Sequence, residues 1–127
     1  MKFLLDTQIA IWALIDDPRL NQPARKILDS SANQFQFSVG TIWEIAIKIS
    51  LDKFRFPKGF KHFLDMVEDN GFEILPMSFE HAIELSTLEF IHRDPFDRLL
   101  IAQCMTDKLI IVTKDDNIKR YNIKRIW

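Results

Sequence analysis

Four acidic residues stand where candidate strands give way to helices, and together they suggest a metal site. Asp6 ends the segment FLLD, and Glu44 lies in TIWEIAIK, Asp97 in DPFDRLLIAQ and Asp115 in LIIVTKD. Residues distant in sequence meet at the carboxyl ends of the strands of an open α/β sheet, where ligands usually bind. Carboxylates brought together repel one another, and a hard divalent cation such as Mg²⁺ or Mn²⁺ relieves that repulsion. The pattern predicts metal-assisted phosphodiester hydrolysis.

Each of these acids also has a simpler interpretation as a helix cap. Acidic side chains accept backbone hydrogen bonds at the start of a helix, and Glu44 follows Thr41 by three residues, as in a capping box. The two interpretations are compatible, because a helix N-terminus also keeps a carboxylate ionised, as a metal ligand must be. The shared position of all four acids at one predicted sheet edge favours the metal site.

Neighbouring polar residues are candidates to support this site. Asp94 precedes Pro95, which is typical of a helix start, so Asp94 is predicted to be an N-cap rather than a ligand. Asp116 adjoins Asp115 and is a candidate to assist it. The hydroxyl groups of Thr7 and Thr113 are predicted to orient the carboxylates or to contact a phosphate; helix capping is the alternative for both.

A phosphodiester substrate also needs positive charge beside the site to hold its phosphates. Arg93 and Arg98 flank Asp97 and are the candidates for this role. Lys48 lies one helical turn after Glu44, so a simple ion pair is its alternative. The histidines are expected at solvent-facing positions, and no histidine metal site is predicted; they are His62, His81 and His92.

The aromatic residues near the middle of the chain divide into two groups. Phe54 and Phe56 lie in a charged connection and are predicted to line an exposed apolar groove suited to a partner's helix or extended segment. Phe60 and Phe63 have helical spacing and are predicted to belong to the core.

The elements that position these residues alternate between strands and helices. Strands are expected at 2–5, 35–38, 72–75, 109–112 and 122–127, with helices between the first four and a short helix before the last. This order predicts a three-layer α/β/α sandwich with a central, mainly parallel sheet. A length of 127 residues and 47% hydrophobic content predict a single domain over residues 1–127.

Composition restricts the setting in which the chain works. Its formal net charge is −1, so no global positive field recruits nucleic acid. Cys104 is the only cysteine, which excludes a disulfide within the chain. The N-terminus lacks a signal-peptide cleavage site, and no stretch reaches the length of a membrane span. We therefore expect a cytoplasmic protein that does not enter a membrane.

Several segments resemble the PIN domain of VapC-type toxins, and the resemblance runs nearly end to end: LLDTQIAIWAL, SVGTIWEIAIKISLDKF, HRDPFDRLLIAQCMTDKLIIVTKDDNIKRY and RIW. It implies an endoribonuclease that uses Mg²⁺ or Mn²⁺ and is the toxin component of a type II toxin–antitoxin system. It further implies a homodimer held inactive by an antitoxin protein, with Asp6, Glu44, Asp97 and Asp115 as the site acids. RNA as the substrate follows from the resemblance alone. The alternative is a non-catalytic PIN-like module that binds RNA or a protein without cutting.

Overall fold

The computed structural model describes residues 1–127 and contains one five-stranded sheet with the strand order β3-β2-β1-β4-β5. All four neighbouring pairs are parallel, which confirms the predicted α/β class. The last strand is shorter than the predicted 122–127. The strands are β1 (Lys2–Leu5), β2 (Gln34–Ser38), β3 (Glu73–Leu75), β4 (Ile110–Val112) and β5 (Arg125–Ile126).

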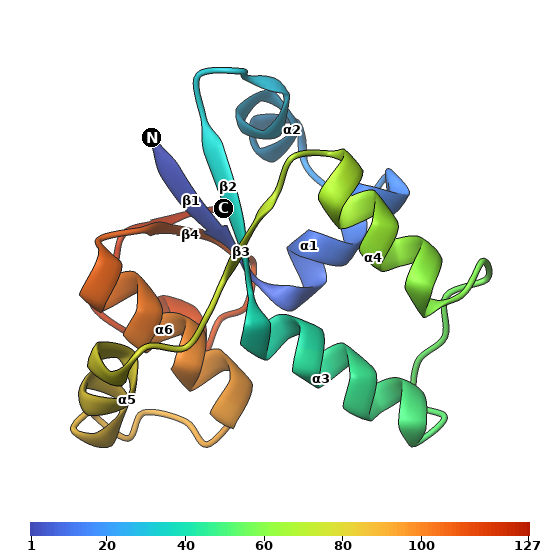
Figure 1. Ribbon diagram of the computed structural model, residues 1–127. Coiled ribbons are helices and arrows are strands. Elements are labelled where there is room, and N and C mark those ends of the chain that lie inside the picture. The colour runs from blue at the N-terminus through green and yellow to red at the C-terminus, as the bar shows by residue number, and fades with distance from the viewer.

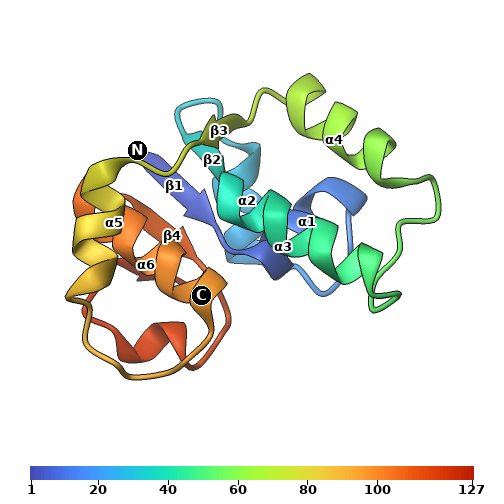
Figure 2. The ribbon, with the colours of Figure 1, turned by 60° about the horizontal axis from the view of Figure 1, so that its bottom comes forward.

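Helices cover both faces of the sheet. Helices α1, α2 and α4 lie over one face and α5 and α6 over the other, while α3 extends from the edge where the strands end (Figures 1 and 2). None of the helices combines the length and apolar character that a membrane span requires. They are α1 (Thr7–Ile15), α2 (Gln22–Asp29), α3 (Val39–Ser50), α4 (Phe60–Asp69), α5 (Phe79–Ser86) and α6 (Pro95–Asp107), with a 3₁₀ turn η1 (Ile118–Arg120).

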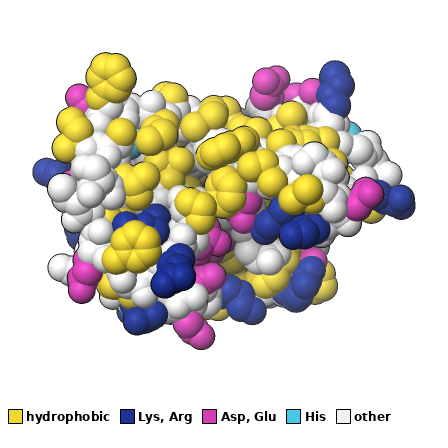
Figure 3. Space-filling view, turned by 90° about the horizontal axis from the view of Figure 1, so that it is seen from below, with side chains coloured by type: hydrophobic (Ala, Val, Ile, Leu, Met, Phe, Trp, Pro, Cys, Tyr) yellow, Lys and Arg dark blue, Asp and Glu magenta, His cyan; other side chains and the backbone are white.

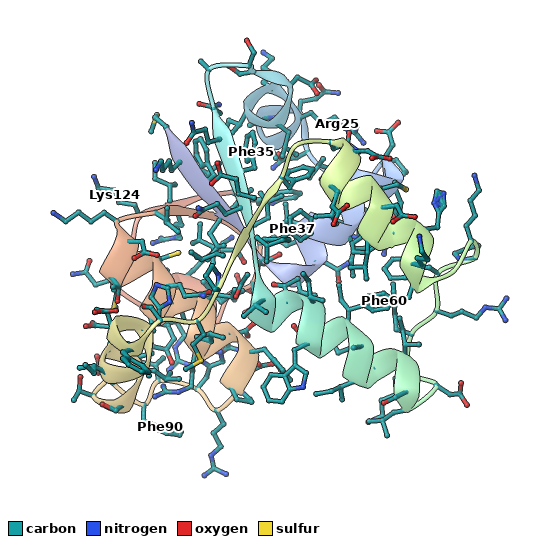
Figure 4. The ribbon with its side chains drawn as sticks, viewed as in Figure 1. Arg25, Phe35, Phe37, Phe60, Phe90 and Lys124 are labelled. Carbon is teal, nitrogen blue, oxygen red and sulfur yellow. The ribbon has the colours of Figure 1, made fainter.

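The alternation of side chains along β1 builds two cores. Phe3 and Leu5 join the core beneath α1, α2 and α4, and Leu4 between them joins the core beneath α6. The first core is rich in aromatic rings: Phe35 and Phe37 project from β2 toward the α1 and α4 side (Figure 4). Burial on both faces explains why the strands read as unbroken apolar runs in the sequence.

Helix starts follow the signals in the sequence. The side chains of Asp6, Asn21 and Asp94 each accept a backbone N–H at the start of α1, α2 and α6. Proline occupies the first turn of α2 and of α6, where its missing N–H costs nothing. At Gly40 in α3, a Cβ would lie 2.7 Å from the Leu99 side chain, so the absence of a side chain lets α3 approach α6.

The topology reverses at β1. The chain adds β2 and β3 on one side of β1 and then returns through α5 and α6 to place β4 on the other side. Leu5 of β1 and Val112 of β4 are register partners, so the residues that follow them, Asp6 and Thr113, leave the sheet side by side. Such a switch point is where an open α/β sheet forms its ligand crevice.

Candidate active site

A cleft of about 250 Å³ opens at the carboxyl ends of the strands. Figure 3 looks onto this side and shows acidic side chains near the middle of the face, below a band of hydrophobic ones and with Lys and Arg to either side. Lys48 is the only Lys or Arg that lines the cleft. All four predicted acids line it, and they come from β1–α1, α3, α6 and the segment after β4: Asp6, Glu44, Asp97 and Asp115.

Asp6 caps a helix and faces the cleft at the same time. Its Oδ1 accepts the Ile9 N–H at 2.8 Å, and its Oδ2 accepts a hydrogen bond from the Thr113 hydroxyl. The Thr113 oxygen in turn accepts the Asp115 N–H at 3.0 Å, so one hydroxyl links the two acids. Burial raises the pKa of Asp6 to about 6, and the charges of Asp115 and Glu44 add to this effect.

Glu44 does not cap α3. The N-cap of that helix is Ser38, whose hydroxyl accepts the Gly40 N–H at 3.0 Å, so the predicted capping-box alternative for Glu44 is wrong. The Glu44 carboxylate instead accepts the Thr7 hydroxyl at 2.7 Å on Oε1, and its Oε2 lies 2.9 Å from Lys48 Nζ. The ion pair considered for Lys48 is therefore present, at the edge of the cleft.

Asp94 caps α6 as predicted, but it also lines the cleft, so its exclusion as a metal ligand stays a prediction. Asp94 is the N-cap of α6 and accepts the N–H groups of Phe96 and Asp97 at 2.9 and 3.0 Å. Asp97 Oδ2 lies 3.1 Å from His92 Nε2. Burial, followed by the Asp94 charge, raises the pKa of Asp97 to about 7, against the opposing effect of the His92 hydrogen bond.

Two of the histidines are not at the predicted solvent-facing positions. The His92 side chain is only 10% exposed, and it contacts both Asp97 and Tyr121. His81 is 2% exposed and pairs with Asp107. A polar loop around His92 and a surface-like helix around His81 carry no sequence signal for these contacts, because both partners come from elsewhere in the chain.

Asp115 is the member of the Asp115–Asp116 pair that lines the cleft. Its Oδ1 accepts the N–H groups of Asn117 and Ile118 at 2.8 and 3.3 Å, which fixes the carboxylate at the start of η1. Asp116 is exposed and lies outside the cleft lining.

The prediction that Arg98 holds a substrate phosphate is wrong. Arg98 is 7% exposed, and its guanidinium donates to the carbonyl oxygens of Glu89 and Leu88 at 3.0 and 3.2 Å. It also lies 4.2 Å from the centre of the Phe90 ring. These contacts secure the segment that leads into α6, and Arg98 is not part of the cleft lining. Arg93 is exposed, and its role remains a prediction.

Phe54 and Phe56 do not form the predicted exposed groove. Phe56 is buried and stacks on Phe63, with ring centroids 4.3 Å apart, and Phe54 is half-buried and lines the acidic cleft. Phe63 belongs to the core as predicted. A separate pocket of about 380 Å³ lies between the end of α1 and α4, and its apolar lining includes Leu14, Ile15, Phe56, Phe63 and Met66.

The chemistry of the donor set suits a hard divalent cation. Each carboxylate is held through one or both oxygens, whereas Asp97 Oδ1 and Asp115 Oδ2 accept no hydrogen bond from the protein. No group of three or more His, Cys, Asp or Glu side chains is close enough together to hold one ion, and mutual repulsion favours that separation. By ligand type the cleft fits Mg²⁺ or Mn²⁺.

Fold and cleft together define a class of small α/β domain with an acidic ligand site at the switch point of a parallel sheet. The model of the PIN domain family matches residues 3–124, so the chain belongs to that family. Members of the family are typically nucleases, which supports a hydrolase, and they generally use divalent metal ions. Comparison with curated proteins gives no significant match.

Solved structures share the fold over nearly the whole chain at low sequence identity. A chain of VapBC2 from Rickettsia felis, bound to a promoter DNA fragment, is 17% identical and superposes with a TM-score of 0.77 over 100% of this chain and 99% of that one. VapBC-1 from nontypeable Haemophilus influenzae gives 14% identity and 0.72 over 99% and 97%. DNA-bound VapBC from Salmonella typhimurium gives 19% identity and 0.69 over 99% and 97%.

Proposed function

We propose that this chain is a Mg²⁺- or Mn²⁺-dependent endoribonuclease and the toxin component of a type II toxin–antitoxin system. The observation that carries the proposal is the convergence of four carboxylates from four separate elements on one cleft at the switch point of the sheet. Burial raises the pKa of Asp6 to about 6, so its charge is costly to the metal-free fold. A module that only binds has no use for such a cost.

The residues divide into those that would hold the ion and those that hold these ligands in place. Asp6, Glu44, Asp97 and Asp115 would bind the metal, while Thr113 holds Asp6 and Thr7 holds Glu44. A divalent ion in such a site lowers the pKa of water and stabilises the charge that develops on phosphate oxygens. Lys48 lies at the edge of the cleft and offers a cation to a neighbouring phosphate.

The direct test compares the wild-type protein with Asp6→Asn and Asp107→Asn. Each is incubated with a mixed RNA pool or with single-stranded DNA, in Mn²⁺, Mg²⁺ or EDTA. We expect metal-dependent RNA cleavage by the wild type and by Asp107→Asn, and none by Asp6→Asn. Asparagine keeps an oxygen that can cap α1, so Asp6→Asn should fold. RNA binding without cleavage by all three proteins would instead support the non-catalytic module.

An antitoxin is the proposed protein partner. The solved relatives are VapBC toxin–antitoxin complexes, and the apolar pocket between α1 and α4 suits an apolar side of an antitoxin segment. Co-expression with the product of the adjoining reading frame tests this proposal. We expect co-purification and loss of RNA cleavage, with both weakened by Met66→Asp in the pocket.

A homodimer is the proposed oligomeric state, in the cytoplasm. Large apolar side chains are exposed on α3 and α5, with Trp43 at 62% and Phe79 at 87%, and such exposure is typical of a protein–protein interface. Sedimentation should give a dimer for the wild type and a monomer for Trp43→Asp. The single thiol, Cys104, is buried and unpaired, which suits a reducing compartment.

A further inference from the structure

Tyr121 joins the polar groups behind Asp97. Its hydroxyl lies 2.8 Å from His92 Nδ1, 3.3 Å from the His92 backbone nitrogen and 3.2 Å from Arg98 Nη1. Tyr121 is buried, and the His92 side chain is nearly so. Bulk water therefore competes little with these three contacts.

The hydrogen-bonding capacity of this hydroxyl determines the protonation of the His92 ring. The backbone N–H of His92 and the guanidinium of Arg98 can only donate, so they use both lone pairs of the phenol oxygen. The one phenol proton is left for the remaining neighbour, His92 Nδ1, which must then accept. The neutral ring consequently carries its hydrogen on Nε2.

That hydrogen points at the proposed active site. His92 Nε2 lies 3.1 Å from Asp97 Oδ2, so the ring donates to this oxygen. Asp97 Oδ1 accepts no hydrogen bond from the protein, and Asp97 lines the cleft. Outer hydrogen bonds of this kind orient metal-ligating side chains, and their loss typically reduces metal affinity.

We propose that His92 is a positioning residue: Tyr121 favours its Nε2–H tautomer, and this N–H holds Asp97 Oδ2, which leaves Oδ1 available to a cation in the cleft. This role rests on the proposed function, because it presumes that a divalent ion binds there. Arg98 completes the arrangement, since its donated hydrogen bond directs the phenol proton of Tyr121 toward the ring.

The test has one readout that needs no metal and one that does. Two-dimensional ¹H–¹⁵N NMR of the metal-free wild type, at a pH where His92 is neutral, should show His92 as the Nε2–H tautomer. Tyr121→Phe leaves only Asp97 to select the tautomer and should raise the fraction of the Nδ1–H form. Calorimetric titration with Mn²⁺ should give a Kd raised roughly 10- to 100-fold in His92→Leu. His92→Gln places an amide N–H near the position of Nε2 and should recover most of the affinity. Asp107→Asn, at the other histidine–carboxylate pair, should bind Mn²⁺ like the wild type.

The outcomes separate this inference from the function on which it rests. An Nδ1–H tautomer in the wild type, or equal Mn²⁺ affinity in wild type, His92→Leu and His92→Gln, would overturn the positioning role while the nuclease could still cut RNA. Absence of Mn²⁺ binding by the wild type itself would overturn the proposed function and, with it, the role assigned to His92. Circular dichroism of each variant ensures that affinity is compared among folded proteins.

Discussion

Helix α6 carries a histidine–carboxylate pair at each end. Asp97 in its first turn lies 3.1 Å from Nε2 of His92, which precedes the helix. Asp107, its last residue, lies 2.8 Å from Nε2 of His81 in α5. The second ring nitrogen is also engaged in both pairs: His92 Nδ1 contacts the Tyr121 hydroxyl, and His81 Nδ1 accepts the Ser78 N–H. Judged by pair geometry alone, the two ends of the helix are equivalent.

The surroundings of the carboxylate make the two pairs different. Asp97 stands among the other acids of the cleft, and its pKa is raised to about 7, first by burial and then by the charge of Asp94. The Asp107 side chain is 36% exposed and lies outside the cleft, and His81 completes a capping box at the start of α5. The same kind of pair therefore secures helix packing at the end of α6, through Asp107, and holds a candidate metal ligand, Asp97, at its start. A second contrast is provided by the lysine–carboxylate pairs of α3 and α4.

Replacing each aspartate by asparagine should give the largest difference in RNA cleavage between the two ends of α6. Asp97→Asn removes a proposed metal ligand, and we expect RNA cleavage to fall by about 1000-fold or more, since metal-ion catalysis is worth several kcal/mol. Asp107→Asn should change the rate by less than about threefold, because no cleft group contacts it. Single-turnover rates at saturating Mn²⁺ provide the measurement. Comparable losses in both variants would mean that the pairs share a structural role.

Removal of His81 should show the reverse pattern. His81→Ala leaves the Ser78 N–H without its side-chain acceptor and opens a gap at a site that is only 2% exposed. We expect the free energy of unfolding to drop by about 2–4 kcal/mol. Urea denaturation measures the drop, and Mn²⁺ titration of the folded variant should give the wild-type affinity. A weaker Mn²⁺ affinity in His81→Ala would show that the pair at the end of α6 also supports the cleft. The two histidine–carboxylate pairs would then not differ in role.

The pH dependence of stability should also come from the cleft. The pKa of Asp6 rises from 3.8 to about 6 on folding, so the folded state binds this proton more tightly than the unfolded state. The stability from this proton is fully present below pH 3.8 and is lost as pH rises through 6. We expect Asp6 to lower the free energy of unfolding in EDTA by about 2 kcal/mol between about pH 4 and pH 7. Asp97, whose pKa is raised to about 7, adds to this fall in the same direction.

Asp6→Asn isolates this effect. The amide carries no buried charge, so the variant should have a flatter pH profile and should exceed the wild type in stability at neutral pH in EDTA. Mn²⁺ should stabilise the wild type increasingly as pH rises, because ligands must lose their protons to bind metal. A wild-type profile that climbs over this pH range would contradict the raised pKa of Asp6.

The sequence predicted the elements and the acids better than it predicted their supports. β1 matches the expected 2–5 because KFLL is an apolar run that ends at a helix cap. Asp6, Asp97 and Asp115 were identifiable because each lies next to a strand end or a helix start, which is local information. Glu44 was identifiable because it lies inside the helix that directly follows β2. Tyr121 was missed because it reaches His92 only after the chain has passed through β4 and η1, and no periodicity encodes that return.

The error at Arg98 has a geometric cause. Successive residues of a helix point about 100° apart, so the neighbour of a cleft-facing Asp97 faces elsewhere. Arg98 shares its face with Ile101 and Ala102, three and four residues on, and both are buried. This spacing is visible in the sequence. It indicates a buried Arg98 more strongly than the position of Arg98 next to Asp97 indicates a phosphate contact. Phe54 and Phe56 were misjudged in a similar way, because loop residues can fold back onto a core that periodicity does not reveal.

The lysine pairs offer the mildest test of the same contrast. Lys48 lies 2.9 Å from Glu44 on α3 and lines the cleft, whereas Lys61 lies 3.0 Å from Asp65 on the outer surface of α4. Partly exposed ion pairs of this spacing contribute little, so Lys48→Gln should change the free energy of unfolding by less than about 1 kcal/mol. Its effect should appear on the substrate instead: loss of one phosphate contact weakens RNA binding severalfold and makes it less sensitive to salt by about one unit of slope. Both variants are compared by salt titration of RNA binding, with Ca²⁺ in place of Mn²⁺ to block cleavage. Lys61→Gln should leave RNA affinity unchanged. If it weakens binding as much as Lys48→Gln does, RNA is held by diffuse surface charge rather than at the cleft.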